Sequence, residues 1–258
     1  MPVVQVGAAP DEHRQLPLAL DLAEGEPRLP DWLRPMLART VACLPDDGRH
    51  VYDPSWGGVR VLAFVRAGTV RLIAARGRDL TARVPEVAAG LGAVLGAAGP
   101  CLLDAELVAP DASGRLDRGA LAARLGRSRA AGRRRSDGVQ ASLVVTDCLV
   151  GGGRSLLARP LADRRDRLSR LLRPAPHVIP LAPFVGSPRE LLEAAGRMGL
   201  AAVLAKDPRG PYLPGVRSRL WLRVSVGRTG PASADYGVGA ATPPRRPDLV
   251  ALLRLPLE

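Results

Sequence analysis

The amino-acid sequence predicts an α+β fold. Apolar runs of strand length recur along the chain, and two of them, residues 59–65 and 69–74, are separated by only three residues, which is hairpin spacing. Later stretches, 85–95, 160–172 and 187–198, place apolar residues at helical spacing. Hairpin strands are antiparallel, so their combination with helices in one chain favours the α+β class.

Further strands are predicted at residues 101–109, 143–147, 201–205 and 220–226. The run 101–109 carries two acids, Asp104 and Glu106, and the two-residue period of a strand places both on the same face. The glycine triplet 151–153 favours a hairpin or crossover over a phosphate cradle, because no helix starts within it.

The helical stretches each have an apolar face. In the first, which Pro85 opens, the face consists of Val87, Leu91, Val94 and Leu95. In the second it consists of Leu161, Leu168, Leu171 and Leu172. Ser187 and Glu190 form the pattern of a capping box, and Gly199 is expected to stop that helix. A shorter helix is predicted at 116–125.

Composition divides the chain into three parts. Residues 1–29 form an acidic, proline-punctuated N-terminal extension with a short strand at 3–6, and residues 30–226 form the folded domain. Residues 227–258 are rich in Pro, Gly and Arg, and we expect a linker and a short C-terminal segment, with a helix at 247–257.

The net charge of +12 favours contact with a polyanion, because guanidinium groups match phosphate well. Only one of the 37 basic residues, Lys206, is a lysine. Arginines gather in residues 126–138, including Arg133, Arg134 and Arg135. Two interpretations of this loop stay open, a nucleic-acid clamp and a solvated surface loop.

The cysteines, the histidines and the apolar runs indicate the cellular compartment and whether a metal is bound. The three cysteines form no Cys-x-x-Cys pair and the three histidines are scattered, so no metal site is expected and the default environment is a reducing cytoplasm. No signal peptide and no apolar run of about 18 residues is present, so we expect a cytoplasmic protein that does not contact a membrane.

Four short blocks carry a family resemblance. They are Tyr52-Asp53-Pro54-Ser55-Trp56-Gly57-Gly58-Val59-Arg60, Gly77-Arg78-Asp79-Leu80-Thr81-Ala82-Arg83-Val84-Pro85-Glu86, Leu103-Asp104-Ala105-Glu106-Leu107-Val108 and Gly199-Leu200-Ala201-Ala202-Val203-Leu204-Ala205-Lys206. In this order and spacing they resemble the adenylation domain of ATP-dependent DNA ligases, above all the bacterial end-joining type. The resemblance covers residues 30–226 and implies two antiparallel sheets flanked by helices.

The resemblance also implies a chemistry. In this family a lysine amine attacks the α-phosphorus of ATP, and the AMP then passes to a 5′-phosphate on nicked duplex DNA. ATP and Mg²⁺ are the implied cofactors, and DNA or a repair protein is the implied partner. Only 32 residues follow Val226, which is too few for the OB-fold domain of the family, so we expect none here.

This sequence departs from the family at its reactive positions. Ser55 stands where the family has the nucleophilic lysine, and Gly57 and Ala201 stand where it has carboxylates. Ala75 replaces an arginine, and Thr146 replaces an aromatic ring that stacks on adenine. The two lysines of the last block appear as Arg223 and Ser225.

The retained residues match nucleotide-facing positions of the family: Arg60, Glu106, Lys206 and Arg223, together with Asp104. A structural ion pair such as Arg60 with Glu106 would explain them equally well. We therefore expect no catalytic residue, and a degenerate adenylation domain that binds DNA or nucleotide in repair or recombination. Two alternatives stay open: an active ligase or nucleotidyltransferase completed by a partner, and a non-enzymatic scaffold.

Overall fold

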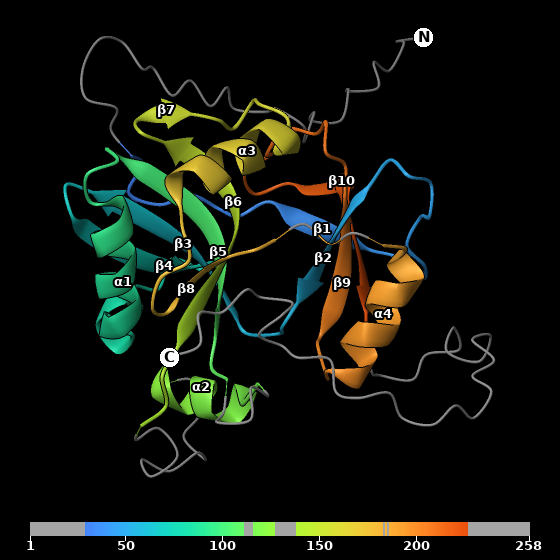
Figure 1. The fold of residues 1–258 in the computed structure, drawn as a ribbon, viewed down its shortest axis with the longest axis horizontal. Coiled ribbons are helices and arrows are strands. Elements are labelled where there is room, and N and C mark those ends of the chain that lie inside the picture. The colour runs from blue at the N-terminus through green and yellow to red at the C-terminus, as the bar shows by residue number, and fades with distance from the viewer. Residues whose placement is uncertain (1–28, 111–115, 127–137, 183, 185, 227–258) are drawn as a thin grey trace, which may run out of the picture.

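The computed structural model describes residues 29–110, 116–126, 138–182, 184 and 186–226, and within them the chain forms two β-sheets with helices packed on them (Figure 1). The four-stranded sheet has the order β1 (Leu37–Thr40), β10 (Arg217–Ser225), β9 (Ala202–Lys206), β2 (Val51–Ser55). The six-stranded sheet has the order β4 (Thr69–Ala74), β3 (Val59–Arg66), β5 (Cys101–Val108), β6 (Ser142–Gly151), β7 (Arg154–Ser155), and β8 (Val178–Pro180) pairs with β6. The predicted α+β class with two sheets is confirmed.

Both sheets are mainly antiparallel, but each carries one parallel pair. β1 runs parallel to β10, and β8 runs parallel to β6. β1 and β8 are short, and each pairs with a strand that is not its neighbour in the sequence. The periodicity of their own residues therefore gives little indication of them. The predicted hairpin is present as β3 and β4, with Ala67 and Gly68 both at positive φ in its turn.

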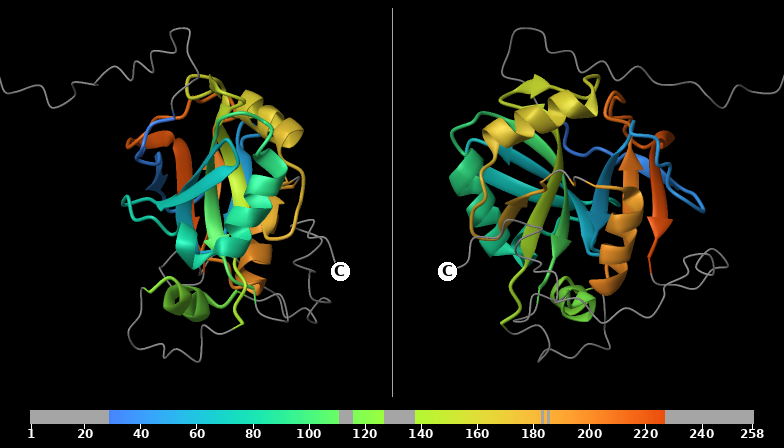
Figure 2. Two further views of the ribbon diagram at one scale, coloured as in Figure 1. Left: turned by 90° about the vertical axis from the view of Figure 1, so that its left-hand side faces the viewer. Right: turned by 45° about the vertical axis from the view of Figure 1, so that its right-hand side comes forward.

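The helices pack on different sheets. α1 (Pro85–Leu95) contacts β3 and β4, and α3 (Leu161–Leu171) contacts β6. α4 (Pro188–Arg197) covers β9 and β2, as the right-hand view of Figure 2 shows. The short helices are α2 (Arg118–Arg124) and the 3₁₀ turn η1 (Thr81–Arg83).

The ends of α4 form as their residue types dictate. Ser187 Oγ accepts from the Glu190 backbone N–H at 3.2 Å, and Glu190 Oε2 accepts from the Ser187 N–H at 3.1 Å. This reciprocal pair is the predicted capping box. Gly199 follows the helix with φ of +66°, a conformation that glycine adopts without steric cost.

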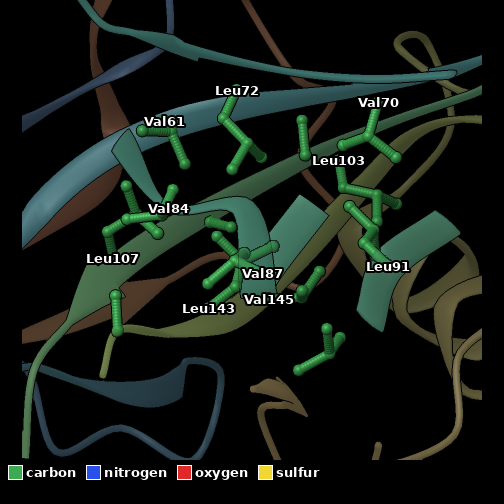
Figure 3. Close-up of a cluster of buried hydrophobic side chains, with 14 of the residues drawn as sticks. Val61, Val70, Leu72, Val84, Val87, Leu91, Leu103, Leu107, Leu143 and Val145 are labelled. Atoms are coloured by element: carbon green, nitrogen blue, oxygen red, sulfur yellow. The ribbon is translucent and has the colours of Figure 1, made fainter. Parts of the chain in front are cut away.

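The main core lies between α1 and the inner face of the six-stranded sheet (Figure 3). Val87 and Leu91 of α1 are fully buried against apolar side chains of β4, β5 and β6, including Leu72, Leu103 and Val145. The alternation of β5 and the helical spacing of α1 together bring these side chains to one interior.

The stretch from Val51 to Arg60 contributes to both sheets. It contains β2, which belongs to the four-stranded sheet, and then crosses through Trp56–Gly58 into β3 of the six-stranded sheet. Gly57 makes this crossing with φ of +74°. The motif therefore joins the two sheets.

Candidate functional site

A cleft of about 430 Å³ lies between the two sheets. Its walls come from β1, β2, β9 and β10 on one side and from β3, β5 and β6 on the other. Every residue singled out from the retained motifs lines it, namely Ser55, Arg60, Asp104, Glu106, Lys206 and Arg223. The volume is within the range of about 300–1,000 Å³ usual for small-molecule sites.

Arg60 and Asp104 form a bidentate ion pair on the floor of this cleft. Arg60 Nε lies 2.9 Å from Asp104 Oδ1, and Arg60 Nη2 lies 2.5 Å from Asp104 Oδ2. Tyr212 also donates its hydroxyl to Asp104 Oδ2 at 2.8 Å. Burial alone would raise the pKa of Asp104, but the charge and hydrogen bonds of Arg60, with smaller contributions from Lys206 and Tyr212, together hold that pKa below its usual range.

The alternative pairing of Arg60 with Glu106 is wrong. The two residues are direct partners across β3 and β5, yet the guanidinium reaches diagonally to Asp104, two residues further along β5. Diagonal neighbours on one face of a sheet are within reach of a long side chain. Asp104 and Glu106 do share one face, as predicted, but they have different partners.

Glu106 binds the backbone of the crossing between the sheets. Its Oε1 accepts from the Gly58 N–H at 2.5 Å, and its Oε2 accepts from the Trp56 N–H at 3.2 Å and from Ser55 Oγ at 3.4 Å. Burial raises the pKa of the Glu106 carboxyl above its ordinary value, although the backbone hydrogen bonds act in the opposite direction. The carboxylate thus holds the crossing in place.

Lys206 is buried beside Asp53. Its Nζ lies 2.9 Å from Asp53 Oδ2 and 4.1 Å from the centroid of the Trp221 ring. Arg165 of α3 pairs with the same Asp53 oxygen. Burial would raise the pKa of Asp53, but the charges of Arg165 and Lys206 outweigh it and lower that pKa. Asp53 Oδ1 is buried without a hydrogen-bond partner among the described residues.

Strand register separates Ser55 from the only lysine in the chain. In the β2–β9 pair, Ser55 is opposite Ala202, whereas Lys206 is opposite Val51. The Lys206 backbone is therefore four residues away from Ser55 along the strands, or about 13 Å. Its side chain spans part of this distance and ends at Asp53.

Gly57 and Ala201, the two positions at which the family has carboxylates, pack closely against each other where Trp56–Gly58 joins the two sheets. A Cβ atom on Gly57 would lie 2.7 Å from the Ala201 Cβ and 2.7 Å from Arg118 Nε. Arg118 donates to the Trp56 carbonyl at 3.0 and 2.8 Å and to the Gly199 carbonyl at 2.8 Å. The space beside Gly57 is thus filled by Ala201 and a guanidinium.

Comparisons with known proteins agree with this geometry. The family model of the ATP dependent DNA ligase domain matches residues 35–224. The chain belongs to the ATP-dependent DNA ligase family. It corresponds to the adenylation domain of the bacterial end-joining type.

Two relatives show which share of a whole ligase this chain corresponds to. DNA ligase C1 of Mycolicibacterium smegmatis is 34% identical over 191 residues, which are 72% of this chain and 54% of that protein. The multifunctional non-homologous end joining protein LigD of Pseudomonas aeruginosa is 31% identical over 230 residues, or 84% of this chain and 26% of that protein. The chain therefore spans between a quarter and about half of these relatives.

Among solved structures, the mycobacterial DNA ligase D complexed with ATP and MES superposes with a TM-score of 0.63 and 27% identity. That match covers 75% of this chain and 60% of the other. The ligase domain of LigD from M. tuberculosis gives a TM-score of 0.62 and 29% identity, covering 76% of this chain and 60% of the other. Both comparisons support the two-sheet architecture described above.

Several residues of this ligase domain were not anticipated as parts of the cleft. Asp53 lies in the first motif, yet its pairing with Lys206 depends on β2–β9 register. Trp221 and Arg217 line the cleft because β10 lies beside β9 and β1. The predicted basic residues Arg133, Arg134 and Arg135 lie outside the described residues, as do the strand at 3–6 and the helix at 247–257.

The carboxylates present in the cleft do not fit a divalent metal. Both oxygens of Asp104 and both oxygens of Glu106 already accept hydrogen bonds from protein donors, and Asp53 Oδ2 is paired with two cations. Asp53 Oδ1 is the single oxygen of these three carboxylates without a partner among the described residues, and one oxygen is too few to hold a divalent ion. Within the described ranges, no group of three or more His, Cys, Asp or Glu residues could hold a metal ion.

None of the helices in the described part of the ligase domain is long and apolar enough to cross a membrane.

Proposed function

We propose that this chain is a degenerate ligase adenylation domain that forms no covalent AMP adduct and retains a role in binding nucleotide or DNA during repair or recombination. The observation that carries the proposal is the position of Ser55 at the cleft wall, with the only lysine, Lys206, tied to Asp53. A serine cannot form the phosphoramidate that the family reaction requires.

The surroundings of Ser55 give it little chemical assistance. Its nearest described partner is Glu106 Oε2 at 3.4 Å, and that oxygen also accepts from the Trp56 N–H at 3.2 Å. A general base typically lies within about 2.6–3.2 Å, heavy atom to heavy atom, of the group whose proton it removes. The loss of metal-binding carboxylates adds to this deficit, because each lost transition-state contact costs about 3–4 kcal/mol.

Retained binding is supported by the cations of the cleft. Arg217 and Arg223 line it from β10. Within the described residues Arg217 donates to the Ala38 carbonyl and Arg223 to Ser225 Oγ, neither of which carries a charge. Lys206 uses one of its donors on Asp53 and lies in the same cleft. Arginine forks match phosphate oxygens well, so a polyphosphate or a nucleic-acid phosphate suits this wall.

The decisive experiment is incubation of the purified chain with α-³²P-ATP and Mg²⁺, followed by denaturing gel electrophoresis. We expect no labelled band, while an active end-joining ligase in parallel gives one. Labelling of the wild-type chain that disappears in Ser55→Ala or Lys206→Met would overturn the proposal and favour an unusual nucleophile.

Binding is measured separately by fluorescence anisotropy with nicked duplex DNA and with a fluorescent ATP analogue, at low and at moderate salt. We expect saturable binding to at least one probe, with an affinity that falls as salt rises. If neither probe binds at low salt, the binding role is wrong and the non-enzymatic scaffold is the correct alternative. If a repair partner restores nick sealing, the partner-completed enzyme is the correct one.

A further inference from the structure

Thr146 faces the cleft because β6 has an extra residue at this point. β5 and β6 pair Ala105 with Val145 and Asp104 with Asp147, so Thr146 lies between these two pairs without a cross-strand partner of its own. A β-bulge of this kind redirects the side chain of the extra residue. Thr146 lines the cleft, and its Oγ1 donates to the Asp104 carbonyl at 3.2 Å. The side chain at this position therefore shapes one wall of the cleft.

The cleft has no open aromatic face. Trp221 is the only aromatic residue among the described residues that line it, and 2% of its surface is exposed. Lys206 Nζ lies over its ring at 4.1 Å from the centroid, and Arg60 Cζ lies over it at 5.4 Å. Tyr212 packs edge to face against the same ring, with centroids 5.6 Å apart. Because bases bind largely by stacking on aromatic rings, this covered ring gives a base no platform.

The side chains that could form hydrogen bonds to the edge of a base are already engaged. Ser55 Oγ donates to Glu106 Oε2, and the oxygens of Asp104 and Glu106 accept from protein donors. Asp53 Oδ1 has no partner among the described residues, but it is fully buried. The Thr40 hydroxyl lines the cleft, and because a hydroxyl both donates and accepts, it does not distinguish one base from another.

The phosphates of a nucleotide meet a different environment in the same cleft. Arg217 is exposed and Arg223 is half-buried, and both line the cleft from β10. Within the described residues, each guanidinium donates to an uncharged oxygen and keeps further N–H groups for a ligand. The family implies ATP as cofactor. The residues present suit its phosphates, but they do not fit its base.

We propose that the cleft binds polyphosphates without recognising a base, because position 146 offers no ring and Trp221 is covered by protein. The cleft then has no selectivity for ATP over other nucleoside triphosphates. Base-independent binding rests on the proposed function, which requires only that nucleotide or DNA is bound. Selectivity is a difference between affinities, and contacts made to the triphosphate alone contribute equally to every nucleotide.

The test titrates the full chain by calorimetry at low salt without Mg²⁺. ATP, GTP, CTP and UTP share one triphosphate, so differences between them report the base. Inorganic tripolyphosphate lacks the base and the ribose, and adenosine lacks the phosphates. We expect the nucleotides and tripolyphosphate to bind with affinities within about threefold of one another, and adenosine not to bind. A preference of about tenfold or more for ATP over UTP or tripolyphosphate would overturn the proposal.

Arg223→Ala shows whether binding takes place in the cleft. It should weaken ATP and tripolyphosphate by the same factor of about tenfold, as expected for loss of a hydrogen bond to a charged group. Arg170→Ala is the matched control, because Arg170 is an arginine of α3 that pairs with Asp166 outside the cleft. It should stay within about twofold of wild type. Equal affinities of the two variants would place the ligand elsewhere and refute the proposal.

An aromatic ring introduced at position 146 provides the converse test. Thr146→Phe should bind ATP at least about tenfold more tightly than tripolyphosphate, since one stacked base contributes this much. Thr69→Phe places the same ring at an exposed threonine of β4 outside the cleft and should keep the wild-type ratio. Thermal melting checks that both variants are folded. A folded Thr146→Phe with the wild-type ratio would refute the role of position 146, and the wild-type titrations decide base independence without either variant.

The outcomes distinguish base-independent binding from the proposed function. Equal binding of all the triphosphates by a chain that forms no AMP adduct supports both. If wild type binds nicked duplex DNA but none of the triphosphates, base-independent binding is wrong and the proposed function stands. If wild type prefers ATP and forms no adduct, the result is the same. If it binds neither DNA nor any triphosphate, both are wrong.

Discussion

Lys206 Nζ lies 2.9 Å from Asp53 Oδ2, and both side chains are almost completely buried, with 3% and 2% of their surface exposed. Arg165 approaches the same carboxylate from α3, so one acid compensates two cations. This cluster connects β2, β9 and α3. A residue that the family resemblance associates with nucleotide is therefore also part of the packing between elements.

Replacing Asp53 by alanine should destabilise the domain strongly. It leaves Lys206 buried without its counter-ion, and removal of one partner of a buried pair costs about 3–5 kcal/mol in the free energy of unfolding. Urea denaturation measures the change. Asp163→Ala is the matched control, because its partner Arg159 is 64% exposed and a surface pair contributes at most about 1 kcal/mol. Equal stabilities of the two variants would contradict the prediction.

Replacing both residues of the buried Arg164–Asp147 pair should lower the free energy of unfolding less than replacing Arg164 alone. Arg164 and Asp147 are both 0% exposed, with Nη2 2.8 Å from Oδ2, and Arg164 also donates to the Gly210 carbonyl at 3.1 Å. Arg164→Met alone should lower the unfolding free energy by about 3–5 kcal/mol, since it leaves a buried carboxylate uncompensated. Arg164→Met with Asp147→Leu should recover part of that loss. A strictly additive double-mutant cycle would show that the two residues are not coupled.

Glu106 should make stability fall as pH rises. Its pKa in the folded chain is raised above the ordinary value of 4.5, so the folded state binds more protons than the unfolded state between these two values. Stability from this residue is therefore complete below pH 4.5 and declines as pH rises through the raised pKa. Subtraction of the unfolding free energies of Glu106→Gln from those of wild type, measured from pH 4 to pH 8, isolates the effect. A flat difference would contradict it.

A lysine at position 55 should not restore adenylation by itself. Ser55→Lys supplies an amine, but Asp104 and Glu106 remain engaged by protein donors and the carboxylates of the family are absent at Gly57 and Ala201. We expect no AMP-labelled band with α-³²P-ATP, Mg²⁺ and the folded variant, with an active ligase as positive control. A labelled Ser55→Lys band would show that the nucleophile is the only missing part.

Sequence patterns predicted the elements whose side chains repeat at a regular period. The face formed by Val87, Leu91 and Leu95 and the shared face of Asp104 and Glu106 both follow from local geometry, and both are present. β1 was not predicted. It has four residues, mostly exposed, and exists because β10 pairs with it.

The partners of charged residues could not be predicted in the same way. Arg164 lies among polar residues of α3 and has no apolar period to mark it, yet it is fully buried on Asp147. The choice of Asp104 over Glu106 by Arg60 depends on a diagonal across two strands. Such pairings depend on strand register and on packing between distant segments. The sequence shows which charged residues are present but not which of them pair.

The close packing of Gly57 against Ala201 also limits which side chains position 57 can accept. Both positions lack the carboxylates seen in the family, and there is now no room between them for another Cβ atom. A mutation that returned an acid to position 57 alone would meet the Ala201 methyl group and the Arg118 side chain before it offered any benefit. An acid at position 57 therefore requires Ala201 or Arg118 to move, and Gly57 also has a positive φ of +74° that other residues adopt with strain.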